Sequence, residues 1–188
     1  MTYKPLGLKP VPGMLSIFQN VQNQVMPFPE HKAFLAKSAA SSIYDANLKI
    51  IDAGGRLYIS EMWRSSDDQR KSYIDFVTGR KASFSLPPGL SMHESGRAID
   101  IDTRPDKLRI PHEKIREILI SCGWSPLVPL GSLGDYHYEY RSTMQQKKYA
   151  VEGYIAMVDD SFKDIRHLQM KYKDIDYEKV VLPENFIK

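Results

Sequence analysis

The sequence predicts an α+β fold, in which helices and short strands are interspersed along one chain. Three short segments alternate apolar and polar residues with the period of two that strands show, at positions 56–63, 97–102 and 135–141. Between them, apolar residues recur at steps of three and four, which places them on one face of a helix. The composition, 42% hydrophobic and 26% charged over 188 residues, is typical of a globular domain with a sizeable core.

The first 29 residues form a proline-rich arm. Proline fixes φ and removes a backbone donor, so we expect an extended segment with at most a short helix near residues 15–25. A helix is then expected over residues 30–51, with apolar or small side chains on one face, and Gly54 and Gly55 end it. We expect the arm to lie over the domain that follows it.

The middle of the chain predicts two further helices. Ser66 or Asp67 caps the first, and Pro111 opens the second, which ends before Gly123. Cys122 shares the apolar face of the second helix, so we expect a small core residue rather than a reactive thiol. It is the only cysteine of the chain, which excludes an internal disulfide.

A long amphipathic helix is expected after the third strand, because apolar positions over residues 143–172 repeat by four and three. Only two heptads are regular, so we favour packing on its own domain over oligomerisation. The chain then divides into an arm over residues 1–29, a domain over 30–142, and a helix with its tail over 143–188.

Charge and hydropathy argue against several classes of partner. The net charge of +3 is spread along the chain, without the basic cluster that nucleic-acid binding needs. No stretch reaches the ~20 apolar residues that span a bilayer. The N-terminus lacks the apolar region of an export signal, so a protein that works outside the cytoplasm would have to be carried or released by something else.

Two histidines stand beside acidic residues. His93 precedes Asp100 by seven positions, and His137 lies between two carboxylates. Two imidazoles and a carboxylate are the three-ligand set of a catalytic zinc site with an open fourth position. On one helix His93 and Asp100 would lie about 10.5 Å apart, too far to share a metal. A turn at Gly96 instead brings a loop histidine beside the strand that carries Asp100.

The third strand adds further polar groups to this face. Strict alternation places Asp135, His137 and Glu139 on one side and three tyrosines on the other. The remaining histidines lie on predicted helices without a partner at metal spacing, and we expect them at the surface: His31, His112 and His167.

The motif Ser-x-His-x-x-Gly-x-Ala-x-Asp at residues 91–100, followed about forty residues later by His137 with Glu139 two further on, resembles the zinc D-alanyl-D-alanine carboxypeptidase family. That family includes vancomycin-resistance D,D-carboxypeptidases and phage L-alanyl-D-glutamate endolysins, and it shares its fold with the hedgehog signalling domain. Upstream, WRS at residues 63–65 and then Gln69 look like the arginine segment of the family. The resemblance implies a small antiparallel sheet flanked by helices.

The resemblance also implies one zinc ion and its three ligands, His93, Asp100 and His137. It implies that Arg64 binds a carboxylate or carbonyl oxygen of the substrate, and that Ser91 and Gln69 contribute to substrate binding. The expected substrate is a stem peptide of peptidoglycan, cut at its D-Ala-D-Ala end or at its L-Ala-D-Glu bond. Such an activity without an export signal suits a phage endolysin or a tail-associated lysin. The resemblance thus implies a protein that stays in the host cytoplasm before release and acts at the bacterial cell wall, or is carried on a particle.

The position of the general base departs from the family. There a carboxylate lies three residues before the second histidine, and here that residue is Gly134. Asp135 is the favoured replacement, since on a regular strand its Cα lies about 6.7 Å from that of His137, and Glu139 is the alternative. Either would assist the attack of a zinc-bound water on a peptide carbonyl, with Arg64 and zinc stabilising the oxyanion.

Two other functions fit the same sequence. The glycine at the base position favours a noncatalytic zinc-containing binding module that keeps the peptidase fold. The arm and the C-terminal helix favour a structural component of a larger assembly, for example a phage particle, that docks partners through them. The choice between carboxypeptidase and endopeptidase stays open, because the loops at residues 80–90 and 125–134 form the walls of the cleft.

Overall fold

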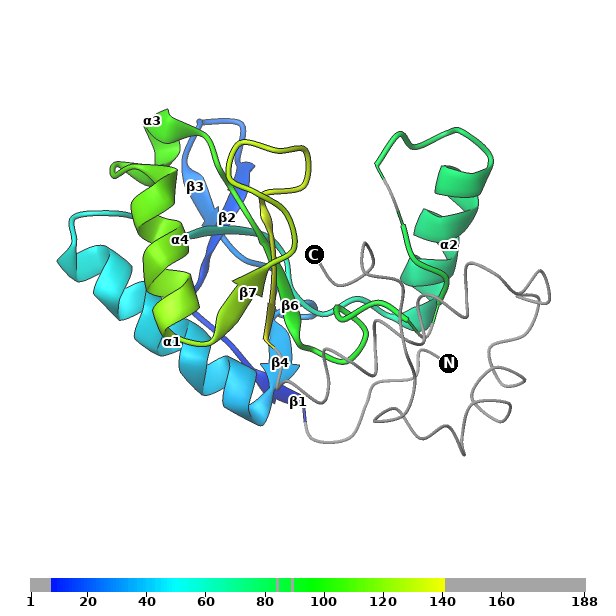
Figure 1. Ribbon diagram of the computed structural model, residues 1–188, viewed down its shortest axis with the longest axis horizontal. Coiled ribbons are helices and arrows are strands. Elements are labelled where there is room, and N and C mark those ends of the chain that lie inside the picture. Colours follow the sequence, from blue (N-terminus) through cyan, green and yellow to red (C-terminus); the bar gives the residue numbers. More distant parts are fainter. Residues whose placement is uncertain (1–7, 84, 89, 141–188) are drawn as a thin grey trace.

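The computed structural model describes residues 8–83, 85–88 and 90–140 of the chain. This part is an α+β fold built on a six-stranded sheet of order β3-β2-β5-β6-β8-β7, with β1 and β4 paired as a separate ribbon (Figure 1). The strands are β1 (Leu8–Pro10), β2 (Leu15–Gln19), β3 (Val25–Pro27), β4 (Phe34–Ala36), β5 (Tyr58–Glu61), β6 (Ala98–Ile101), β7 (Trp124–Pro126) and β8 (His137–Tyr140). The helices are α1 (Lys37–Asp52), α2 (Ser66–Val77), α3 (Pro105–Leu108) and α4 (His112–Ser121).

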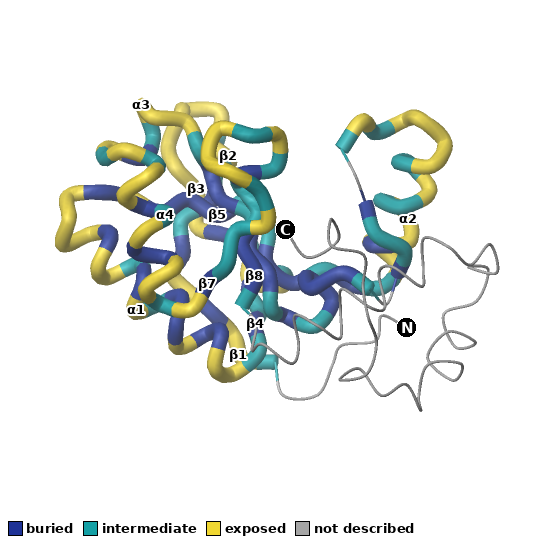
Figure 2. Tube along the Cα trace, viewed as in Figure 1, coloured by how far each residue is buried: buried dark blue, intermediate teal, exposed yellow. Residues whose placement is uncertain are grey.

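Helices α1 and α4 cover one face of the sheet, whereas α2 stands apart on the other side (Figure 1). The apolar stripe of α1 is fully buried, with Ile43, Ala46 and Ile50 at 0% exposure. It packs with Ile115 and Leu119 of α4 into one core cluster, and Figure 2 shows this buried layer between helices and strands. The opposite face of β6 and β8 is left for polar side chains.

The central strands pair as the site requires. β5 pairs antiparallel with β6, β6 with β8, and β8 with β7, whereas β2 lies parallel to β5, so the sheet is mixed rather than purely antiparallel as expected. In the β6–β8 register, Asp100 lies directly opposite His137. Directly opposed residues of antiparallel strands have Cβ atoms about 4.5–5.5 Å apart, which brings these two side chains together.

The strands expected over residues 56–63, 97–102 and 135–141 are confirmed by β5, β6 and β8. The helix expected after Ser66 or Asp67 is confirmed as α2, although its N-cap is Ser65, whose Oγ accepts the Asp68 backbone N–H at 3.1 Å. The first helix begins at Lys37 rather than near residue 30, because residues 34–36 form β4 instead.

The N-terminal arm differs from its expected form. No helix occurs near residues 15–25; β2 and β3 form a hairpin there, and β2 joins the central sheet beside β5. Val11 and Met14 are almost fully buried, so this segment is part of the core rather than a cover over it. Burial in β2 does not follow residue polarity, since Ser16 is buried and Phe18 is exposed, so no alternating pattern marks this strand in the sequence.

Two short elements, α3 and β7, had no sequence signal long enough to predict them. The helix predicted over residues 143–172 lies outside the described residues. Within the described ranges, no helix has the length and apolar character needed to cross a bilayer.

Gly96 closes the turn that leads from the His93 loop into β6. Its φ is 66°, and a Cβ at this position would clash with Leu8 Cδ2 and lie 2.9 Å from the Ala36 backbone nitrogen. That nitrogen donates to the Gly96 carbonyl at 2.8 Å. Glycine is therefore required here both for its backbone conformation and for the close approach of β4.

Replacing Gly96 with alanine should destabilise the protein strongly. The left-handed conformation costs an L-residue about 1–2 kcal/mol, and the clash with β4 adds about 1–3 kcal/mol. Denaturant unfolding of Gly96→Ala and Gly79→Ala measures the difference, since Gly79 has φ 72° but open space around it. Equal losses of unfolding free energy in the two variants would contradict the packing argument.

Candidate metal site

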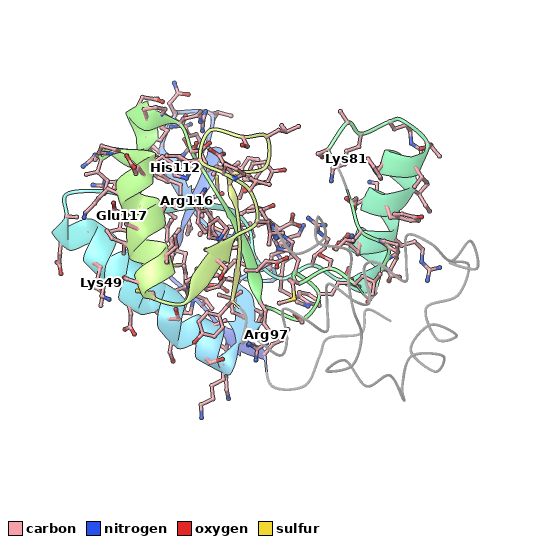
Figure 3. The ribbon with its side chains drawn as sticks, viewed as in Figure 1. Lys49, Lys81, Arg97, His112, Arg116 and Glu117 are labelled. Carbon is pink, nitrogen blue, oxygen red and sulfur yellow. The ribbon has the colours of Figure 1, made fainter. Side chains whose placement is uncertain are left out.

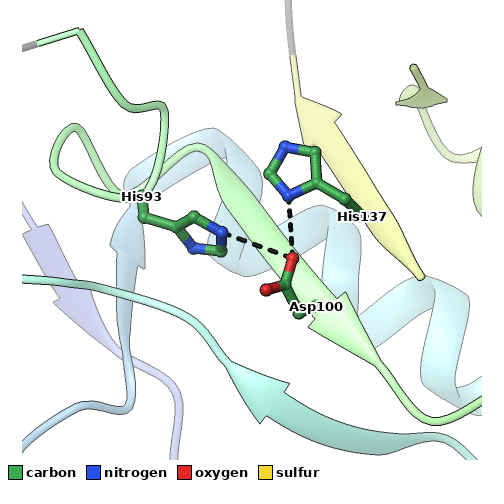
Figure 4. Close-up of side chains that lie close together, drawn as sticks. All are labelled: His93, Asp100 and His137. Carbon is green, nitrogen blue, oxygen red and sulfur yellow. Dashed lines mark hydrogen bonds and ion pairs between the residues drawn. The ribbon is translucent and has the colours of Figure 1, made fainter. Parts of the chain in front are cut away.

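Three side chains from three segments converge on the open face of the sheet (Figure 4). His93 comes from the loop before β6, Asp100 from β6 and His137 from β8. Each offers one ligand atom, and these atoms all lie within 4.8 Å of one another. The structure therefore brings together the three residues that the sequence predicted as metal ligands.

His93 is held by the segment that follows β5. Its ring is buried, and its Nδ1 lies 2.7 Å from the carbonyl oxygen of Met62. The backbone N–H of Arg64 donates to the His93 carbonyl at 3.3 Å. Donation from Nδ1 to Met62 leaves Nε2 with its lone pair toward Asp100, 3.3 Å away, which is the tautomer that a metal requires.

His137 shares the same carboxylate. Its Nδ1 lies 2.7 Å from Asp100 Oδ1, and its Nε2 lies 3.0 Å from Glu139 Oε1. Burial by itself would raise the pKa of Asp100, but the electrostatic interaction with His93 and the hydrogen bond with His137 hold that pKa well below its usual range. The carboxyl is thus ionised at neutral pH, the form in which it ligates a metal.

This donor set suits zinc. Two imidazole nitrogens and one carboxylate oxygen leave one position of a tetrahedron open. A carboxylate on the far nitrogen of a ligating histidine is a common support of such sites, and Glu139 takes that place beside His137. Among the described residues, no other group of three histidine, cysteine or carboxylate side chains comes this close.

The cluster lies in a cleft of about 290 Å³ between the sheet and the α2 segment. Arg64, Gln69 and Ser91 line it beside the metal-site residues. The structure thus places all three predicted substrate-binding side chains in one cavity. Gln69 is buried on α2 and accepts a hydrogen bond from Arg64 Nη1 at 2.6 Å, which sets the direction of the guanidinium.

Arg64 has an acidic partner that the sequence interpretation did not include. The carboxylate of Glu61, at the end of β5, accepts a hydrogen bond from Arg64 Nε at 2.8 Å. Its second oxygen forms an ion pair with Arg64 Nη2. Burial alone would raise the pKa of Glu61; the hydrogen bond from Arg64 holds it below its ordinary value. In the sequence, the only sign of this pair was that Glu61 and Arg64 lie three positions apart. Such a spacing predicts contact on a helix but not at the end of a strand.

Asp135 does not reach the cleft. Its carboxylate accepts the Gly131 backbone N–H at 2.8 Å and lies 3.6 Å from His112 Nδ1, at the N-terminal end of α4. β8 begins only at His137, and Gly134 has φ 97°, so the alternation assumed for residues 135–139 does not include Asp135. Asp135, the favoured candidate for the general base, is therefore not among the residues that line the cleft, whereas Glu139 is.

His112 also differs from its expected surface position. Its side chain is only 11% exposed, and Nε2 lies 3.0 Å from the hydroxyl of Tyr138, which is fully buried under the sheet. In Figure 3, His112 and Arg116 lie on the same helix, α4. Arg116 Nη2 donates to the Val128 carbonyl at 2.9 Å, so α4 anchors the loop that forms one wall of the cleft.

The stability of the protein should depend on His112 in mildly acidic solution. Burial lowers the pKa of His112 below its ordinary value, while nearby Asp135 opposes this shift and Arg116 adds to it. A depressed histidine pKa favours the neutral folded form, so stability is lost as pH falls below the unfolded value of about 6.5. The unfolding free energy of His112→Gln, measured by denaturant between pH 7.5 and 5.5, should fall less than that of the wild type. An identical decline in both would contradict this assignment.

Comparison with solved structures identifies the fold. The LD-carboxypeptidase LdcB, whose structure reveals the molecular basis of peptidoglycan recognition, aligns with a TM-score of 0.57 at 19% identity over 73% of this chain and 69% of LdcB. This chain has the fold of that carboxypeptidase. No protein-family model and no curated protein sequence matches the chain.

Two further solved structures align less well. VanYB in complex with D-alanine-D-alanine has a TM-score of 0.47 at 16% identity, over 77% of this chain and 89% of its own. The vancomycin-resistance D,D-pentapeptidase VanY in complex with Zn(II) has a TM-score of 0.49 at 16% identity, over 78% of this chain and 87% of its own.

Proposed function

We propose that the protein is a zinc-dependent peptidase that cleaves the stem peptide of peptidoglycan. The observation that supports this most directly is the His93, Asp100 and His137 cluster in a cleft whose wall carries Arg64, Gln69 and Ser91. The fold shared with LdcB supports peptidoglycan as the substrate source. A D-Ala-D-Ala end and an L-Ala-D-Glu bond remain the two candidate cleavage points.

Zinc in this site would be held by His93, Asp100 and His137, and it would supply a Lewis acid that polarises a carbonyl and lowers the pKa of water. Arg64 donates to the oxygen on which negative charge develops, since two of its five N–H groups remain beyond those given to Glu61 and Gln69. The low accessibility of the cleft floor strengthens such a hydrogen bond.

Glu139 is assigned as general base. Apart from Asp100, it is the only carboxylate among the described residues that line the cleft. It takes a proton from the attacking water and returns it to the departing amine, as a carboxylate in such sites does. Its contact with His137 Nε2 also orients that ring, so one side chain combines both roles.

The chain should bind about one zinc ion, and His93→Ala should lose it. Removal of a ligand should weaken zinc by more than the roughly 10- to 100-fold typical of a lost outer-sphere partner. Metal analysis after dialysis measures the content, and His31→Ala is the matched control because His31 is exposed and outside the cluster. Retention of full zinc by folded His93→Ala would refute the assigned site.

Glu139→Gln should abolish turnover without removing zinc. The amide oxygen still accepts a hydrogen bond from His137, but it takes up no proton, so kcat should fall about 10²- to 10⁴-fold. Release of D-Ala or of new N-termini from purified peptidoglycan measures the activity. Asp135→Asn is the matched control, since Asp135 faces away from the cleft, and it should retain activity within a few-fold.

A noncatalytic binding module is the second candidate, and two observations favour it. Gly134 lines the cleft without a side chain, and Asp135 turns toward α4. A wild-type protein that binds zinc and peptidoglycan but releases no product would establish this alternative. The phage origin and the docking of partners through the arm or the C-terminal helix stay predictions of the sequence, tested by a search for the protein in purified particles.

A further inference from the structure

The positive charge of Arg64 is already balanced within the protein. Glu61 accepts hydrogen bonds from Nε and Nη2 of Arg64. Both side chains are mostly buried, with 13% of Arg64 and 22% of Glu61 exposed. A bidentate pair of this kind has no net charge to offer an anion. Its remaining N–H groups suit a carbonyl oxygen better than a full carboxylate.

A second cation lies on the same wall of the cleft. Lys81 follows α2, lines the cavity together with the metal cluster, and lies on the side of the α2 segment that faces the sheet (Figure 3). Its Nζ donates to Ser72 Oγ at 2.8 Å, a neutral partner. Among the described residues, no salt bridge involves Lys81, whereas its neighbour Arg80 pairs with Asp75 at 2.8 Å.

A chain of hydrogen bonds fixes the two cations relative to each other. From Arg64 the chain passes to Gln69 at 2.6 Å, and Gln69 Nε2 donates to Ser85 Oγ at 3.1 Å. Ser85 in turn donates to Ser72 Oγ at 3.0 Å, the oxygen that receives Lys81. Because each link is a short polar contact on a partly buried wall, the ammonium group is held in place before any ligand arrives.

The facing wall has the opposite character. Leu127, Val128 and Leu133 line the cleft there, and Leu133 is 91% exposed. An anionic ligand group therefore has one favourable side in this cavity, the one that carries Lys81. A ligand that enters would place apolar groups against the leucines and its charge toward α2.

We propose that Lys81 is a specificity-determining residue that binds a carboxylate of the peptide, while Arg64 serves the carbonyl oxygen. This inference rests on the proposed function for the identity of the substrate. It adds a specificity to that function, because the preferred peptide is one with a free carboxylate at the α2 side of the cleft. Amidation of that carboxylate should weaken binding, because an amide cannot form the ion pair with Lys81.

Three synthetic peptides test the proposal. One is L-Ala-γ-D-Glu-L-Lys-D-Ala-D-Ala, and the others carry an amide at the α-carboxyl of the glutamate or at the C-terminus. Calorimetry on the full chain in chelator gives Kd without consuming peptide, and steady-state assays on the zinc-loaded chain give KM and kcat. Amidation of the carboxylate that binds Lys81 should raise Kd and KM about tenfold relative to the unamidated peptide, with kcat changed little. Amidation of the other carboxylate should change neither.

Substitutions of Lys81 and of its neighbour Arg80 test whether Lys81 causes the preference for the free carboxylate. Lys81→Met should raise Kd for the preferred acid about tenfold and leave its amide unchanged, so that the two peptides bind equally. Lys81→Arg should keep most of the preference, because it keeps the charge. Arg80→Met is the matched control, since it removes a neighbouring cation that is exposed and paired, and it should bind as the wild type does.

The outcomes separate this inference from the proposed function. Equal Kd values for all three peptides in the wild type, or an equal loss of affinity for all three in Lys81→Met, would overturn the role of Lys81 even if hydrolysis occurs. An acid preference that Lys81→Met removes, without hydrolysis of any peptide, would support Lys81 and refute the peptidase.

Discussion

The pairing of β6 with β8 is the contact on which the site depends. It places Asp100 opposite His137, so that one carboxylate oxygen lies between two imidazoles. The third member, His93, arrives from a loop whose direction is set by Gly96 and by the carbonyl of Met62. A shift of one residue in this register would turn Asp100 into the core and expose Ile99, which is now fully buried. Such a shift is unfavourable because it buries a charge and exposes an apolar side chain.

The cleft is built from buried polar groups that satisfy one another. Asp100 is compensated by the histidines, Glu61 by Arg64, and Arg64 is further held by Gln69. Breaking a buried pair leaves an unpaired charge in a poorly solvated place, which costs about 3–5 kcal/mol. The network therefore fixes the positions of the side chains around the candidate metal site more firmly than isolated surface contacts could.

The side of the sheet on which a carboxylate lies decides its chemistry. Asp135 and Glu139 are close in sequence, yet one contacts α4 and the loop at residue 131, and the other lines the cleft. The turn at Gly134 separates them, because the strand geometry begins only after it. This arrangement assigns Asp135 to the support of a cleft wall and leaves Glu139 beside His137.

By itself the sequence determined the α+β class, the strands at β5, β6 and β8, the helices α2 and α4, and the three residues of the candidate metal cluster. These depend on local periodicity, on turn glycines and on a motif whose residue types are chemically specific. The tertiary structure decided what depends on contacts between distant segments: the entry of β2 into the sheet, the Glu61 partner of Arg64, the burial of His112, and the direction of Asp135. Side-chain direction near a turn follows from backbone dihedrals and long-range packing, which no pattern of neighbouring residues encodes.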